Sequence, residues 1–176
     1  MSNLRLLSEH STSGVNNISV TNVFTDEYDT YKIVFYDMDQ SGAGGSHNNT
    51  RFLDVNGAQV EEAIYDYAQS QIKSYSSFGV DDYFNQSYFR VLGQITGSSA
   101  VGAGAAIYIF NPTNENEYTM AIGQSVGFYE GAGFLGGKSI ACLKQTSKIT
   151  GIKFYTNTTS TTYESIKFRI YGVRKD

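Results

Sequence analysis

A glycine-rich segment near residue 135 carries the pattern closest to a known chemical motif. Residues 132–139 (AGFLGGKS) match a phosphate-binding loop, except that Ala132 stands where the first glycine belongs. The overlapping residues 131–136 fit the spacing of a dinucleotide-binding loop. Such loops hold phosphate because their amides begin a helix within a parallel sheet. Residues 139–144 form a short apolar segment that is followed at once by another strand pattern, which leaves no helix for a phosphate to bind. The sequence therefore predicts a glycine-rich loop over 127–137 and no cofactor.

Two aspartates in the first half of the chain follow the start of a calcium-binding loop. Asp37 and Asp39 alternate ahead of Gly42, as the first oxygen ligands of such a loop do. The twelfth position, counted from Asp37, is Asn48 rather than the glutamate that closes the loop, and no helical pattern flanks the segment. We therefore expect no metal site here.

Other reactive side chains lack the neighbours that catalysis needs. Three carboxylates at residues 26–29 lie in one polar turn, where solvated acidic residues are ordinary. Cys142 lies in a strand-like stretch and is expected to be a buried, inert thiol. His10 and His47 lie among small polar residues in expected loops, away from Cys142. The sequence therefore predicts no catalytic residue and a protein that is not an enzyme.

Composition favours an all-β protein of one domain. The 176 residues include 18 Gly, 14 Tyr and 11 Phe but one Pro and no Trp, and aromatic residues suit pleated sheets while glycine suits turns. A net charge of −4 lacks the basic surface that nucleic acid requires, so we expect no nucleic-acid partner. No apolar run reaches membrane-spanning length and the start is not a signal peptide, so synthesis in the cytoplasm and no membrane contact are expected.

Alternating apolar and polar residues predict where the strands lie. In the last third of the chain, Ile152 and Phe154 point one way while Lys153 and Tyr155 point the other, which is typical of a sheet with one dry face. About ten short strands are expected, over residues 17–24, 30–38, 51–55, 59–68, 87–95, 105–111, 117–128, 138–143, 148–155 and 164–173. This pattern predicts an antiparallel β-sandwich of the jelly-roll kind.

Two parts of the chain are harder to assign. Residues 60–72 also show helical spacing, but the Asn56-Gly57 turn favours a following strand. Residues 1–14 are expected to form an arm outside a single domain at 15–176, and 74–85 to form a surface excursion.

Exposed aromatic and leucine side chains are the candidates for contact surfaces. Tyrosine gathers at interfaces because it offers a large area and a polar end. The protein-interface candidates lie in the arm, the excursion and the glycine-rich loop: Leu4, Leu6, Leu7, Tyr75, Phe78, Tyr83, Phe84, Phe128, Tyr129, Phe134 and Leu135.

Several segments taken together resemble a group of small structural proteins from tailed bacteriophages of aquatic bacteria. They are LLSE at 6–9, DEYDTYKIVF at 26–35, YDYA at 65–68, ITGIKF at 149–154 and IKFRIYGV at 166–173. The resemblance implies a β-sandwich displayed on the virion, as a capsid decoration protein or a tail or fibre component, and often a symmetric oligomer. It implies no binding residues.

These expectations define the function to be tested. The chain is expected to be a non-enzymatic virion protein, assembled in the host cytoplasm, that binds other capsid or tail proteins and forms a homo-oligomer, for which a trimer is one candidate. The alternative is a receptor-binding or carbohydrate-binding module of a tail fibre that contacts a host surface glycan. The absence of tryptophan counts against a sugar platform.

Overall fold

Eleven β-strands and no helix make up the part of the chain that the structure describes. The computed structural model describes residues 3–41, 47–76, 78–92, 102–129 and 133–174. The strands are β1 (Leu4–Thr12), β2 (Asn17–Val20), β3 (Thr30–Gln40), β4 (Asn48–Asp54), β5 (Tyr65–Lys73), β6 (Gly79–Gln86), β7 (Gly104–Phe110), β8 (Thr119–Tyr129), β9 (Gly133–Leu143), β10 (Ile149–Thr156) and β11 (Tyr163–Val173).

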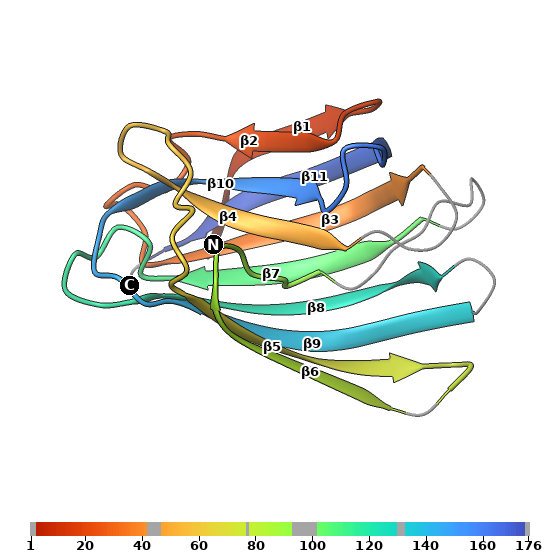
Figure 1. Ribbon diagram of the computed structural model, residues 1–176. Helices are drawn as coiled ribbons and strands as arrows, with labels where there is room; N and C mark the ends of the chain where they lie inside the picture. Colours follow the sequence, from red (N-terminus) through yellow and green to blue (C-terminus); the bar gives the residue numbers. More distant parts are fainter. Residues whose placement is uncertain (1–2, 42–46, 77, 93–101, 130–132, 175–176) are drawn as a thin grey trace.

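The strands form two antiparallel sheets that pack against each other (Figure 1). The large sheet has eight strands in the order β1-β11-β3-β7-β8-β9-β5-β6, and the small sheet has three in the order β2-β10-β4. The prediction of an all-β antiparallel sandwich is confirmed. The small sheet lies over the β11, β3 and β7 part of the large sheet, whereas β8, β9, β5 and β6 extend beyond it (Figure 1).

An aromatic cluster joins the two sheets at the centre of the core. Phe154 on β10 packs against Phe35 on β3 and Phe168 on β11, with ring centroids 5.0 and 5.5 Å apart. The predicted alternation in the last third is confirmed, since Ile152 and Phe154 are fully buried, as is Ile170 on β11. Although β10 and β11 are consecutive in the chain, they lie in different sheets and face each other across the core.

The segment from 87 to 92 covers the inner face of the large sheet where the small sheet does not reach. The Nε2 amide of Gln69 on β5 donates to the carbonyls of Arg90 and Leu92 at 3.1 and 3.4 Å. A Cβ atom at Gly123 on β8 would lie 2.4 Å from the carbonyl oxygen of Val91, so glycine permits this close approach. We expected a strand over 87–95, but the described part pairs only through a bridge between Thr50 and Phe89. Residues 93–95 of this expected strand lie outside the described residues, as do residues 97–101 of a second glycine-rich loop that the sequence predicts over 97–104.

The Asn56-Gly57 turn is present, but the strand expected after it begins later than predicted. The amide of Gly57 donates to the carbonyl of Asp54 at 3.0 Å, and Gly57 has a φ of 77°. The Asp54 carboxylate also accepts the amides of Asn56 and Ala58. Pairing beyond the turn stops at Val60, whose amide donates to Phe52, and β5 begins only at residue 65. A strand over 59–68 was therefore wrong in its start, and the helical alternative does not form.

The segment expected as an N-terminal arm is a strand of the large sheet. β1 pairs with β11 in antiparallel register, from Leu4 opposite Val173 to Thr12 opposite Ile166. Its backbone hydrogen bonds are made within the same chain, and residues 1–2 lie outside the described part. The arm prediction is corrected accordingly: residues 4–12 form an edge strand of the sandwich.

Two segments expected as loops also form strands. β6 occupies much of the predicted excursion at 74–85 and pairs with β5 as a hairpin. β8 and β9 extend through much of the predicted loop at 127–137, with Phe128 opposite Phe134, and residues 130–132 lie outside the described part. The high glycine content, which is typical of loops, did not prevent strand formation here, because the neighbouring strands supply hydrogen-bond partners on both sides of β9.

Candidate interaction surface

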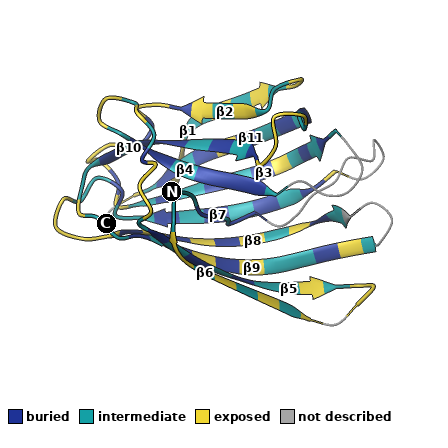
Figure 2. Cartoon of the chain, in the orientation of Figure 1, coloured by how far each residue is buried: buried dark blue, intermediate teal, exposed yellow. Residues whose placement is uncertain are grey.

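The outer face of the large sheet, which points away from the small sheet, carries many exposed apolar side chains. Residues along β9 alternate between buried and exposed (Figure 2), and the same holds for its neighbours. Exposed fractions range from 37% for Ile122 to 67% for Ile72. We call this set the outer apolar face: Ile72, Val80, Phe84, Met120, Ile122, Val126, Phe134 and Ile140.

Strand register places these residues side by side. Ile122 on β8 lies opposite Ile140 on β9, and Ile140 lies opposite Ala68 on β5. Ala68 in turn lies opposite Asp82 on β6, so one row crosses four strands. Directly paired residues on one face of antiparallel strands have Cβ atoms about 5 Å apart. The outer apolar face therefore extends across these strands, and the more polar row of Gln124, Lys138, Ser70 and Val80 crosses it.

A shallow hollow of about 560 Å³ lies within this face. Phe84, Phe110, Met120 and Ile140 are among the residues that line it, and the side chains of β5, β6, β8 and β9 meet there. Cys142 also lines the hollow and is half-buried rather than buried as expected. Burial raises the pKa of its thiol, which favours the neutral form.

Charged side chains on this face are few and of both signs. Asp66 is paired with Lys144 at 2.8 Å and accepts the amide of Asn85, and both contacts lower the pKa of its carboxyl. Lys138 on β9 and Asp82 on β6 are exposed and have no ion-pair partner among the described residues. Among the described residues of β5, β6, β8 and β9, this face therefore carries one unpaired cation and one unpaired anion.

The structure divides the interface candidates of the predicted excursion between two faces. Tyr75, Phe78 and Phe84 are 39%, 62% and 64% exposed. Tyr83 points to the inner side instead and stacks on Tyr67, with centroids 4.8 Å apart. Only Phe84 of these residues belongs to the outer apolar face.

The candidates of the β8–β9 hairpin are divided in the same way. Phe128 and Phe134 meet edge to face at 5.4 Å, and Phe134 is 56% exposed. Leu135, next along β9, points to the inner side and is buried. Tyr129 ends β8, and its side chain lies outside the described part.

The N-terminal leucines lie at the opposite edge of the large sheet. Leu4 and Leu6 are 39% and 49% exposed on β1, whereas Leu7 packs against the core. They are therefore not brought together with the aromatic candidates, because the edge strands β1 and β6 are separated by the whole width of the sheet.

Sequence reasoning missed most of the outer apolar face, although the signal was present. In β8 the larger apolar residues Met120, Ile122 and Val126 alternate with Ala121 and Gly123. The larger residues face outward and the smaller face inward. Alternation shows that two faces differ, but only the position of the covering segment at 87–92 determines which one is buried.

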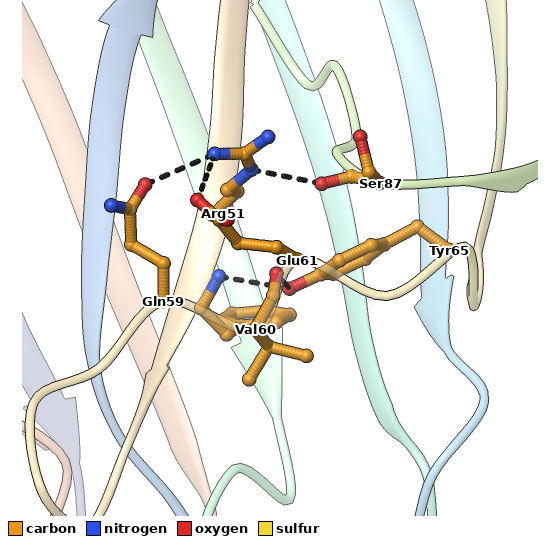
Figure 3. A network of polar contacts seen from close by, with 7 residues as sticks. Arg51, Gln59, Val60, Glu61, Tyr65 and Ser87 are labelled. Atoms are coloured by element: carbon orange, nitrogen blue, oxygen red, sulfur yellow. Dashed lines mark hydrogen bonds and ion pairs between the residues drawn. The ribbon is translucent and has the colours of Figure 1, made fainter.

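A connected polar cluster lies between β4 and β5, and its members bond to one another within the chain (Figure 3). The Arg51 guanidinium donates to Glu61 at 2.6 Å, to Gln59 at 3.1 Å and to the carbonyl of Ser87 at 2.9 Å. The hydroxyl of Tyr65 accepts the amide of Phe52 and donates to the carbonyl of Val60. Burial raises the pKa of Tyr65, so it remains protonated. These contacts hold the segment between β4 and β5 in place.

The motifs that first suggested chemistry lie in ordinary structural positions. The described part of the phosphate-loop pattern, residues 133–139, is strand β9. Asp37 lies in β3 and pairs with Lys167 at 2.8 Å. In the acidic turn, Asp26 pairs with Lys148 and Glu27 with Arg5. Among the described residues, no three His, Cys, Asp or Glu side chains form a group that could hold a metal ion.

The two histidines predict a fall in stability below neutral pH. Burial lowers the pKa of His47 from 6.5 to about 4, assisted by the charge of Arg90. His47 therefore binds a proton near pH 6.5 in the unfolded chain but only near pH 4 in the folded chain. The free energy of unfolding is thus highest above pH 6.5 and decreases as the pH falls toward 4. We expect a loss of about 1–2 kcal/mol from His47, because the ring is only partly buried.

Urea denaturation of the wild type and of His47→Gln between pH 7 and 4 measures this loss. The variant should show a shallower fall, and the difference between the two curves isolates His47 from the carboxylates. Burial also lowers the pKa of His10, so His10→Gln should remove a further part of the fall. Parallel curves for the wild type and His47→Gln would contradict the prediction.

Comparison with protein-family models, with curated proteins and with solved structures gave no match to this chain. No helix in the described residues is long and apolar enough to cross a membrane.

Proposed function

We propose that this chain is a non-enzymatic structural protein of a bacteriophage virion that acts through protein–protein contact. The outer apolar face is the observation that carries the proposal. If a fully exposed side chain of this size presents about 200 Å², its eight residues expose roughly 900 Å² between them. The largest apolar patch on a typical monomer is about 300–600 Å², and larger patches mark interaction sites.

The fold supports a structural role in a particle. A sandwich with an aromatic core and a satisfied polar cluster gives a rigid body, and the outer apolar face becomes buried when that body assembles. The resemblance of the strand segments to phage structural proteins supplies the setting, with assembly in the host cytoplasm and capsid or tail proteins as partners. Decoration of the capsid and association with the tail are both included in the proposal.

Analysis of purified virions tests this function. Mass spectrometry should find the chain at a fixed number of copies per particle, and image reconstruction should show the sandwich in density on the capsid or tail. Absence of the chain from washed particles would overturn the proposal.

The alternative of glycan binding draws less support from the hollow in the outer face. A sugar site combines an aromatic platform with several hydrogen-bonding side chains. The hollow offers Phe84 and Phe110, but its carboxylates are Asp82 and Asp66, and Asp66 is already engaged by Lys144. Strong binding of the isolated chain on a glycan array would favour the alternative.

A further inference from the structure

We propose that the partner that covers the outer apolar face is a second copy of this chain, packed face to face about a two-fold axis. The inference rests on the homo-oligomer that the proposed function includes and identifies its surface. Two sheets stacked in this way would bury a sheet face between copies, as the small and large sheets do within one copy.

The exposed area matches what a stable pair requires. A stable interface buries about 800 Å² on each partner, close to the roughly 900 Å² that the outer apolar face presents. Charged residues are depleted at the centre of such interfaces and aromatic residues and methionine are enriched. Phe84, Phe134 and Met120 fit that composition.

The two unpaired charges on the face are complementary to each other under two-fold symmetry. Lys138 lies opposite Ser70 on β5, and Asp82 lies opposite Ala68 on the other side of the same strand. The two charges thus lie diagonally across β5, about 10 Å apart in strand spacing, too far to pair within one copy. A two-fold axis in the plane between the two copies, crossing over β5 between Ala68 and Ser70 and perpendicular to the line that joins the two charges, would place Lys138 of each copy over Asp82 of the other.

A partner that carried charges of only one sign could pair with Lys138 or with Asp82, but not with both. An isologous interface uses the same patch twice, so each contact between residues occurs in both directions. One cation and one anion at interchangeable positions therefore form two ion pairs per dimer. Alanine and serine at the axis are small, which permits close approach of the two β5 strands. A second copy is thus the partner that satisfies both the area and the charges.

Sedimentation velocity and light scattering of the purified full chain test the inference. The wild type should sediment as a dimer at micromolar concentration. Ile140→Glu places a charge at the centre of the face and should raise the dissociation constant by at least about 100-fold. Val55→Glu is the matched control, because Val55 is 55% exposed in the turn after β4, away from the face. It should remain dimeric, and circular dichroism should show both variants folded.

Charge reversal gives a second readout that does not depend on tolerating a buried glutamate. Lys138→Glu and Asp82→Lys should each weaken the dimer roughly tenfold, and the double variant should restore it. A wild-type chain that is monomeric at all concentrations would overturn the inference, as would a trimer or larger form, or a dimer indifferent to Ile140→Glu and to charge reversal. These measurements use no virion component, so a dimeric chain that is absent from virions would overturn only the proposed function.

Discussion

Replacement of Phe168 with alanine is expected to lower the free energy of unfolding by about 3–5 kcal/mol. Phe168 on β11 is fully buried and contacts rings from three other strands. Its centroid lies 4.9 Å from Phe35, 5.5 Å from Phe154 and 4.9 Å from His10. Truncation removes these contacts and leaves a cavity between two sheets that cannot close without shifting their strands. Urea denaturation at fixed protein concentration measures the loss.

An exposed phenylalanine provides the matched control for this experiment. Phe78 is 62% exposed before β6, so Phe78→Ala makes the same chemical change without a core cavity. Its effect should stay within about 0.5 kcal/mol. The denaturant slope should be unchanged for both variants, because neither alters the surface exposed on unfolding. Equal losses of unfolding free energy for the two variants would show that Phe168 does not contribute to the core as expected.

Prediction from the sequence succeeded where one face of a strand is fully covered. β11 alternates Ile166, Phe168 and Ile170 with Lys167 and Arg169, and the apolar set is buried as expected. The near-continuous apolar run at 30–38 likewise became β3, close to the centre of the core. In such strands, polarity and burial give the same answer, so the local pattern is sufficient.

Prediction failed where partners distant in the sequence determine the structure. β1 forms because it pairs with β11, which follows some 160 residues later in the chain. The pattern of residues 4–12 alone does not indicate this pairing. The segment at 87–92 is held against the large sheet by Gln69 and by close approach to Gly123 rather than by strand pairing. Neither contact is visible in a local pattern. The outer apolar face was missed for the same reason, since its exposure depends on what lies beneath β8 and β9.

Replacement of Asn48 with alanine is expected to cost about 3 kcal/mol, through lost hydrogen bonds. The Asn48 side-chain oxygen accepts from the Gln40 amide at 2.5 Å and from the Tyr163 hydroxyl at 3.0 Å. All three residues are fully buried, and they lie on β4, β3 and β11, so this cluster joins the small sheet to the large one. Removal of the acceptor takes away both hydrogen bonds and leaves the buried Tyr163 hydroxyl and part of the Gln40 amide without this acceptor, at about 1–3 kcal/mol for a buried unsatisfied group.

Tyr163→Phe separates the cost of an unsatisfied donor from the loss of one hydrogen bond. It removes the hydroxyl donor together with its bond, and Asn48 still accepts from Gln40, so the expected cost is only about 1 kcal/mol. Burial raises the pKa of Tyr163, so the hydroxyl stays a donor and the contrast should persist up to pH 9. If Asn48→Ala lowered the free energy of unfolding no more than Tyr163→Phe, water would be binding the freed donors, and the cluster would be accessible to solvent. A threefold difference between the two losses would instead show that this polar contact, and not only the aromatic core, stabilises the packing of the small sheet on the large one.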